Sequence, residues 1–346
     1  MAGKFIDIAK VLERRLAGEA YALKKFPTEM ELAEEFQISR NTVRKVLDLL
    51  IERKVLKKSP HKSVEVVTST TSLSFAFLAP AVYSEMFERL RFFVEHEAQK
   101  FGARLKVVDY TDWEDPVVAE TLKAFDGVFV IPLSEALPKA VQKLLMTSEI
   151  PVVAFEQNLS GLGIPSIIST PDIFVQHILD YLESLGHKNI HCVNTQNSDA
   201  VIQARIQQWE LWKLVHGTKG QLIHEPVERY GQPLITAHRR MVDFLKTNPS
   251  QGTALLCLTE PCAIGALRAC WDCGLVVGKD ISLATFDSGL SKFMVPALAC
   301  VDMPDLSAYV GLCLKWMQAN NKTWSGPLLL QPMVAKIFAG ESVVKS

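Results

Sequence analysis

The first fifty residues carry apolar positions at intervals of three and four, the spacing that buries one side of a helix. One such stripe covers residues 5–16. A second covers residues 28–37 and opens at Thr28, with Glu31 at the spacing of a helix-capping box. A third covers residues 39–51 and opens at a serine, another favourable capping residue. The pattern predicts three short helices that pack on one another.

Beyond the third helix the pattern changes to that of short strands. Two apolar runs flank the turn-forming residues 59–63, which predicts a two-stranded wing with a basic tip. Residues 68–74 are small and polar, and they carry neither charge nor a helical stripe. We therefore expect a head over residues 1–67, a linker over 68–74 and a larger domain over 75–340.

In the larger domain, apolar strand-like runs alternate with helical stretches. The runs cover residues 75–79, 105–108, 127–131, 152–155, 190–193, 254–258 and 281–286. The helical stretches begin near Tyr83, Pro116, Glu135 and Pro171 and then cover 200–215, 233–246 and 262–271. Such alternation is typical of parallel sheets covered by helices. The two sets predict an α/β domain of two parallel-sheet lobes, with a cleft at the carboxyl ends of the strands.

Charge is distributed unevenly along the chain. Residues 1–62 hold 14 Lys and Arg against 9 Asp and Glu, although the whole chain has a net charge of −1. Within residues 40–62 eight side chains are basic and two are acidic. A lone basic run is more often a solvated surface than a binding site. Here it coincides with the third helix and the wing, which favours a polyanionic partner.

The two helices before the wing have the pattern of a helix-turn-helix, whose second helix reads the major groove through its first turns. The apolar stripe of the third helix leaves Arg40, Asn41, Arg44 and Lys45 on the opposite side. Arginine suits guanine and asparagine suits adenine. We expect these side chains to face DNA.

The stretch FPTEMELAEEFQISRNTVRKVLDLLIERKVL resembles the winged helix of GntR-type regulators, and the resemblance covers residues 5–67. Met30 stands where that family usually has arginine, and Pro60 and His61 replace its glycine-rich wing tip. The resemblance implies DNA contacts by Arg40, Asn41, Thr42 and Arg44. Together with the basic wing and the start of the second helix, the full set expected to contact DNA is Thr28, Arg40, Asn41, Thr42, Arg44, Lys45, Lys58, His61 and Lys62.

The larger domain resembles the periplasmic-binding-protein-like domain of LacI/GalR-type regulators over about residues 73–338. The stretches LESLGHKNI, ALLCLTEPCAIGALRACWDCGLVVGKDISLATFD and LLLQPMVAK carry this resemblance. It implies that Arg205 grips ligand hydroxyls, that Trp209 supplies an aromatic wall and that Asp287 accepts hydroxyl hydrogen bonds. A planar guanidinium is suited to vicinal oxygens because it donates in a fork. Alternatively, Arg205 is an ordinary helix-surface residue.

Further effector contacts are expected where other strands end. Glu156 and the pair Thr259-Glu260 stand where the family has Asp and Asn-Asp. The full set expected to bind the effector is Ser84, Glu156, Ser169, Arg205, Trp209, Tyr230, Thr259, Glu260, Phe286 and Asp287. One cation with acids and aromatic rings suits a sugar or polyol better than a purine.

Several classes of function lack sequence support. The amino terminus mixes charge with apolar residues, unlike a signal peptide, and no run is long enough to cross a membrane. The seven cysteines are odd in number and scattered through apolar segments, which indicates a reducing, cytoplasmic location. Cys270 and Cys273 have redox or zinc spacing but no second pair at finger spacing. We expect no metal, no cofactor and no catalytic residue, and therefore no enzyme.

Together these features predict a cytoplasmic transcription regulator, a repressor by the resemblance, that binds double-stranded operator DNA as a homodimer under control of a sugar-like effector. Two alternatives are left open, of which the first shares the bilobed fold. One is a solute-binding component of transport, which would need export and would not need the basic head. The other is a sugar-modifying protein, which turnover assays would reveal.

Overall fold

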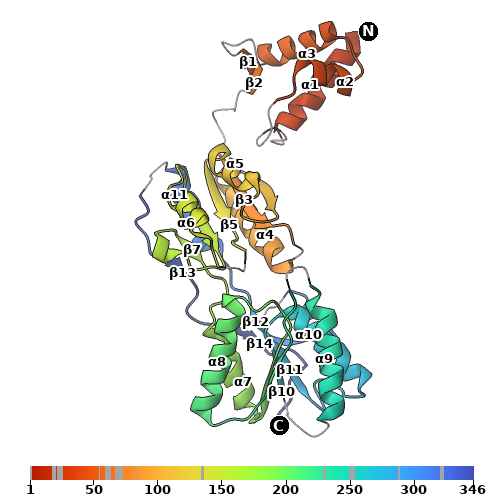
Figure 1. The fold of residues 1–346 in the computed structure, drawn as a ribbon, viewed down its shortest axis with the longest axis vertical. Coiled ribbons are helices and arrows are strands. Elements are labelled where there is room, and N and C mark those ends of the chain that lie inside the picture. The colour runs from red at the N-terminus through yellow and green to blue at the C-terminus, as the bar shows by residue number, and fades with distance from the viewer. Residues whose placement is uncertain are drawn as a thin grey trace.

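The computed structural model has a small head and two larger lobes arranged along its longest axis (Figure 1). It describes residues 2–17, 21, 26–53, 55–58, 64–66, 73–82, 84–133, 136–228, 231–248, 254–286, 289–319 and 323–346. The expected residues His61, Lys62, Tyr230 and Asp287 lie outside this set, as does the side chain of Lys58.

The head consists of three helices and a two-stranded sheet. Its elements are α1 (Ala2–Ala17), α2 (Glu29–Glu35), α3 (Arg40–Glu52), β1 (Leu56–Lys58) and β2 (Val64–Val66). Helix α3 forms because Ser39 caps its first turn, and its buried stripe packs on α1 and α2. The strands pair antiparallel, with Lys58 opposite Val64. This is the winged helix-turn-helix that the sequence predicts.

Lobe one contains a six-stranded, entirely parallel sheet in the order β13-β7-β6-β5-β3-β4. Its strands are β3 (Ser74–Pro80), β4 (Arg104–Tyr110), β5 (Gly127–Val130), β6 (Val152–Phe155), β7 (Ser166–Ile167) and β13 (Leu329–Leu330). Helices α4 (Glu85–Lys100) and α11 (Ser307–Gln318) cover one face, and α5 (Pro116–Ala124) and α6 (Lys139–Met146) cover the other. The central strands are buried on both faces, as their continuous apolar runs require.

Lobe two repeats this plan with the order β14-β12-β11-β10-β8-β9. Its strands are β8 (Ile190–Asn194), β9 (Leu222–His224), β10 (Ala254–Cys257), β11 (Ser282–Thr285), β12 (Ala299–Asp302) and β14 (Lys336–Phe338), of which only β14 runs antiparallel to its neighbour. Helices α7 (Phe174–Ser184) and α8 (Ala200–His216) cover one face, and α9 (Pro233–Thr247) and α10 (Glu260–Asp272) cover the other. The predicted pair of parallel-sheet lobes is confirmed.

The chain passes between the lobes three times. It leaves lobe one after β7, returns after β12 to form α11 and β13, and crosses again to form β14. The tail beyond β14 also belongs to lobe two, because the Ser342 hydroxyl donates to the Leu283 carbonyl and the Ser346 amide donates to the Leu185 carbonyl. Three connecting segments hold the lobes as a pair while leaving each with its own core.

Candidate DNA-binding head and effector site

Helix α3 presents a polar side to solvent. Arg40, Asn41, Arg44 and Lys45 are exposed, whereas the apolar stripe of the same helix, Val43, Val46, Leu47 and Leu50, is buried. The arrangement follows from the apolar stripe, which fixes how the helix rotates on α1 and α2. The four expected side chains therefore share one accessible surface at the start of the helix, where DNA-binding helices contact base edges.

Arg44 is not a free cation in this structure. Its Nε atom donates to the Glu29 carboxylate at 3.0 Å, and its side chain is 61% exposed. An exposed pair of this kind contributes little to folding. Only the Nε donor is engaged, so the two Nη groups can still contact a phosphate or a base, while the nearby Glu29 carboxylate reduces the attraction of this surface for DNA.

Thr28 caps the first turn of α2. Its hydroxyl donates to the Glu31 carboxylate at 2.8 Å and accepts from the Glu31 amide at 3.3 Å, while its amide donates to the same carboxylate. These hydrogen bonds lower the pKa of Glu31. Thr28 therefore fixes the entry to the helix-turn-helix, and its predicted contact with DNA is additional to that structural role.

Arg205 of α8, which the sequence predicts to bind the effector, is 4% exposed. Its Nη1 donates to the Leu258 carbonyl at 2.7 Å, and its Nη2 reaches the Thr170 hydroxyl at 3.4 Å. Its guanidinium carbon lies 4.1 Å from the centre of the Phe286 ring, the geometry of a cation–π contact. Its Nε donor has no partner within the described part of the chain. Buried donors normally have a partner, so this Nε is a candidate to donate a hydrogen bond to a ligand.

Three buried hydroxyl groups at the ends of parallel strands also have no partner among the described residues. They belong to Ser169, which follows β7, to Thr259, which follows β10, and to Thr285, which ends β11. Thr259 holds the N-cap position of α10 without making the usual capping hydrogen bond. Buried polar atoms normally find a partner. These hydroxyls lie where ligands of open α/β sheets bind.

The expected acids take different positions. Glu156 follows β6 in the left-handed backbone region, at φ 59°, and its carboxylate accepts from the Ser169 amide at 3.0 Å. Glu260 is buried and accepts from the amide and the hydroxyl of Ser291 at 2.7 and 2.8 Å. Both carboxylates therefore fix neighbouring loops at the strand ends. Ser84 caps α4 by accepting from the Phe87 amide.

Trp209 lies elsewhere than the sequence suggested. Its side chain is 1% exposed and belongs to the core of lobe two, where its indole N–H donates to the Ile190 carbonyl at 3.2 Å. One turn of α8 separates it from Arg205, but only the arginine reaches the strand ends. Phe286 is the aromatic ring that lies against Arg205. Thr170 and Thr285 were missed, and their only signal was their position at or beyond strand ends.

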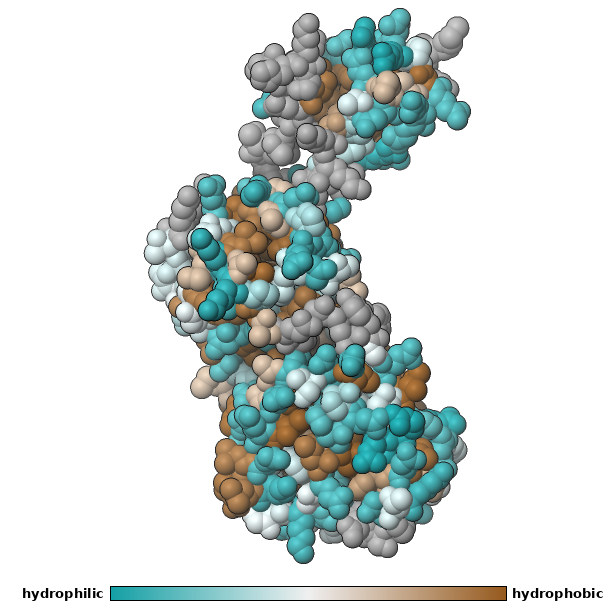
Figure 2. Space-filling view, in the orientation of Figure 1, coloured by the Kyte–Doolittle hydropathy of each residue, from teal (hydrophilic) through white to brown (hydrophobic). Residues whose placement is uncertain are grey.

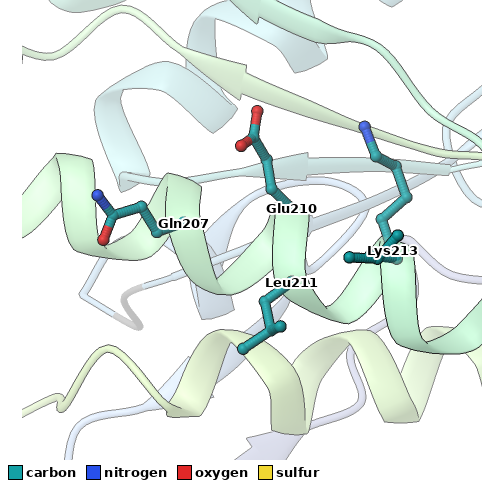
Figure 3. A pocket seen from close by; sticks show the side chains of 5 residues that line it. Gln207, Glu210, Leu211 and Lys213 are labelled. Carbon is teal, nitrogen blue, oxygen red and sulfur yellow. The ribbon is translucent and has the colours of Figure 1, made fainter.

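A separate hollow of about 450 Å³ lies on the outer side of α8 (Figure 3). Gln207, Glu210, Leu211, Lys213 and Leu214 line it, and all come from this one helix. Figure 2 shows hydrophobic side chains gathered over this part of lobe two. The hollow faces away from the buried side of α8 that carries Arg205, so it is distinct from the strand-end site.

Other features of the described residues bear on chemistry. Burial raises the pKa of the Cys270 thiol to about 12, so this group stays protonated at neutral pH. No cluster of three or more metal-binding side chains occurs within the described ranges. None of the helices described is long and apolar enough to span a bilayer.

Comparison with known proteins assigns both parts of the chain. Residues 7–66 match the gntR family of bacterial regulatory proteins, and residues 179–306 match the periplasmic binding protein-like domain. The chain therefore combines a gntR-family DNA-binding domain with a periplasmic binding protein-like domain. The sequence-based assignment of both domains is thereby confirmed.

Curated relatives are transcriptional repressors by name. The chain is 24% identical to the arabinose metabolism transcriptional repressor of Geobacillus stearothermophilus, over 82% of each chain. It is 25% identical to the probable HTH-type transcriptional repressor ExuR of Bacillus subtilis, over 52% of this chain and 53% of that one. The second match thus spans about half of that relative.

Solved structures share the fold. The lac repressor dimer bound to operator and an anti-inducer superposes with a TM-score of 0.64 at 17% identity, covering 80% of this chain and 96% of that chain. A LacI family regulator from Enterococcus faecium with bound ribose gives 0.65 at 19% identity, covering 79% and 99%. The two-lobed architecture of the regulator is therefore that of LacI-type effector domains.

Proposed function

We propose that the regulator is a cytoplasmic repressor that binds operator DNA through the head and releases it when a sugar or polyol binds between the lobes. We place the head at residues 1–67, the linker at 68–74 and the effector-binding domain at 75–340. The observation that carries the effector assignment is the buried Arg205, whose Nε lacks a partner among the described residues and whose side chain covers Phe286.

A hydroxyl-rich ligand matches the groups around this arginine. The unpartnered hydroxyls of Ser169, Thr259 and Thr285 can donate or accept, and the Glu156 and Glu260 carboxylates accept. Sugar hydroxyls supply both donors and acceptors, and the Phe286 ring offers an apolar surface to the carbon side of a sugar. Tyr230 and Asp287 complete the proposed set. The relatives named for arabinose metabolism and solved with ribose support this class of ligand.

The head supplies the DNA-binding function. Arg40, Asn41, Thr42 and Lys45 lie at the start of α3, and we assign them, with Arg44, to groove and phosphate contacts. Thr28 and the wing residues Lys58, His61 and Lys62 would contact the flanking backbone. Phosphate contacts release counterions, so operator affinity should fall steeply with salt.

A homodimer would place two heads on one operator. The loop after β11 exposes Phe293 and Val295, at 81% and 91%. Large apolar side chains this exposed mark an interaction surface. Paired with the same surface of a second copy, they would form a symmetric interface. Effector-driven lobe movement would then change the separation of the two heads.

The test uses the full-length chain and two measurements on each variant. Melting temperatures are recorded with L-arabinose, D-ribose, D-galactose and D-glucitol, and DNA affinity is measured on a fragment selected from genomic DNA. Arg205→Ala should abolish the melting shift and the loss of DNA binding caused by whichever compound acts on the wild type, while DNA affinity without it stays unchanged.

Arg268→Ala serves as the matched control, because it removes an exposed arginine of α10 that pairs with Asp272. It should respond like the wild type. A normal ligand response in Arg205→Ala would reject the effector site. Absence of any preferred genomic duplex would reject the repressor assignment.

A further inference from the structure

The two lobes contact each other at a glycine. Gly289 follows β11 in lobe two and lies against the first turn of α4 in lobe one. A Cβ atom at this position would stand 2.9 Å from the Glu85 Cγ and 3.0 Å from the Glu260 Oε2. Glu85 is the first residue of α4, and Glu260 is the first residue of α10. The two helices lie on opposite sides of the boundary between the lobes (Figure 1). The lack of a side chain at Gly289 is what lets the lobes approach this closely.

Two carboxylates lie close to Gly289. The Glu85 Oε1 lies 3.4 Å and the Glu260 Oε2 lies 3.0 Å from the same Cβ position. The two oxygens are therefore at most about 6.4 Å apart, inside the screening length of physiological salt, which is about 8 Å. They come from different lobes, so their separation depends on how far the cleft is closed.

Glu260 has a fixed orientation. Its Oε1 accepts both hydrogen bonds from Ser291, which leaves its Oε2 toward Gly289. For Glu85, the described part of the chain offers neither an ion pair nor a hydrogen bond to the side chain. No described cation therefore neutralises the pair, and two like charges at this distance oppose the approach of the lobes.

We propose that Glu85 and Glu260 form an interlobe carboxylate pair that disfavours close approach of the lobes until hydroxyl donors of an effector bridge it. This inference rests on the proposed function and extends the effector site to Glu85. Hydrogen-bond donors between two carboxylates turn a repulsion into an attraction shared by both lobes. Only a ligand that hydrogen-bonds to both carboxylates gains this attraction. Such a ligand binds the closed arrangement of the lobes more tightly than the open one, and this difference in affinity is what couples effector binding to lobe closure.

The neighbours of the pair support a ligand in this place. Thr259 precedes Glu260, is 8% exposed, and has a hydroxyl with neither a capping role nor another described partner. Ser84 precedes Glu85 at the start of α4. The acids thus continue the row of polar groups at the strand ends and extend it onto lobe one.

The test compares Glu85→Gln and Glu85→Lys with the wild type in the full-length chain without any effector. Glu85→Gln removes the repulsion at nearly constant size, and Glu85→Lys supplies a cation that can bridge to Glu260. Hydrogen–deuterium exchange is followed at the Ser291 and Phe87 amides, which lie on the two sides of the contact. Glu149→Gln, an exposed change elsewhere in lobe one, is the matched control.

Exchange at both amides should slow in the order wild type, Gln, Lys, and the control should match the wild type. For charges about 6.4 Å apart, effective dielectric constants between those of water and of a protein surface give a factor of about 3 to 80 between wild type and Gln. Unchanged or faster exchange in both variants would overturn the inference. Because the measurement needs no effector, a wild-type chain that ignores every sugar would instead reject the proposed function.

Discussion

Arg44 of α3 allows the DNA-binding surface to be tested separately from stability. The change is Arg44→Ala, which removes an exposed guanidinium and its 3.0 Å contact with Glu29. An exposed ion pair contributes about 0.2–1 kcal/mol to folding, so the head should lose no more than that. A base contact made by arginine is worth about 1–3 kcal/mol, which corresponds to a loss of operator affinity of about 5- to 150-fold.

The measurement is fluorescence anisotropy on the selected genomic fragment at several salt concentrations. If Arg44 contacts a phosphate as well as a base, the slope of log affinity against log salt should also become shallower by about 0.9. Arg14→Ala is the control, because Arg14 is an exposed arginine of α1 and the change in net charge is identical. Equal affinities for the two variants would show that α3 has been assigned to the wrong surface.

Glu29→Gln probes the same contact from the other partner. It frees Arg44 and removes a negative charge beside the DNA-facing side of the helix, so operator affinity should rise rather than fall. A fall in affinity would mean that Glu29 positions Arg44 for DNA instead of competing with it.

Two further predictions concern residues whose role the tertiary structure clarifies. Trp209→Ala should lower the free energy of unfolding by about 3–5 kcal/mol in urea titrations, because it empties part of the lobe-two core. Trp209→Phe should leave effector affinity within a fewfold of that of the wild type. A loss of effector affinity as large as that of Arg205→Ala would instead place the Trp209 ring in the cleft. The pKa of Glu31 is lowered, first by the hydrogen bond from the Thr28 amide, so its contribution to α2 is complete above the ordinary carboxyl value and is lost as pH falls through the lowered one. Exchange protection of the α2 amides should therefore drop in acid in the wild type and change less in Glu31→Gln, and equal profiles would contradict the capping box.

The helices and strands that the sequence predicted share a local cause. Caps such as Thr28 and Ser39, and the apolar stripes behind them, set where α2 and α3 begin and which side they bury. In the lobes, buried strands such as β5 and β10 were visible as short apolar runs. Weaker elements escaped notice, among them β7 and β13 with two residues each. Strands this short carry too little periodicity to be recognised.

The sequence around Arg205 indicated that this residue binds the effector, but nothing in the sequence indicated which groups contact it. The Leu258 carbonyl and Thr170 lie 53 and 35 positions away in the chain, and they meet the arginine only when α8 packs beside the sheet. Trp209 lies on the same helix and had the same kind of signal. The rotation of α8 about its own axis places the Trp209 indole in the core of lobe two, and this rotation is set by how the helix packs on the sheet.

By itself, the sequence determined the type of each domain, because helix caps, apolar periodicity and the basic third helix depend on residues close together in the chain. Only the tertiary structure decided which segments share a lobe, since the chain crosses three times and returns for α11, β13 and β14. It alone brought Glu85 and Glu260 to one glycine from opposite lobes. Contacts of this kind form between surfaces that local patterns do not encode, because they depend on how whole lobes pack.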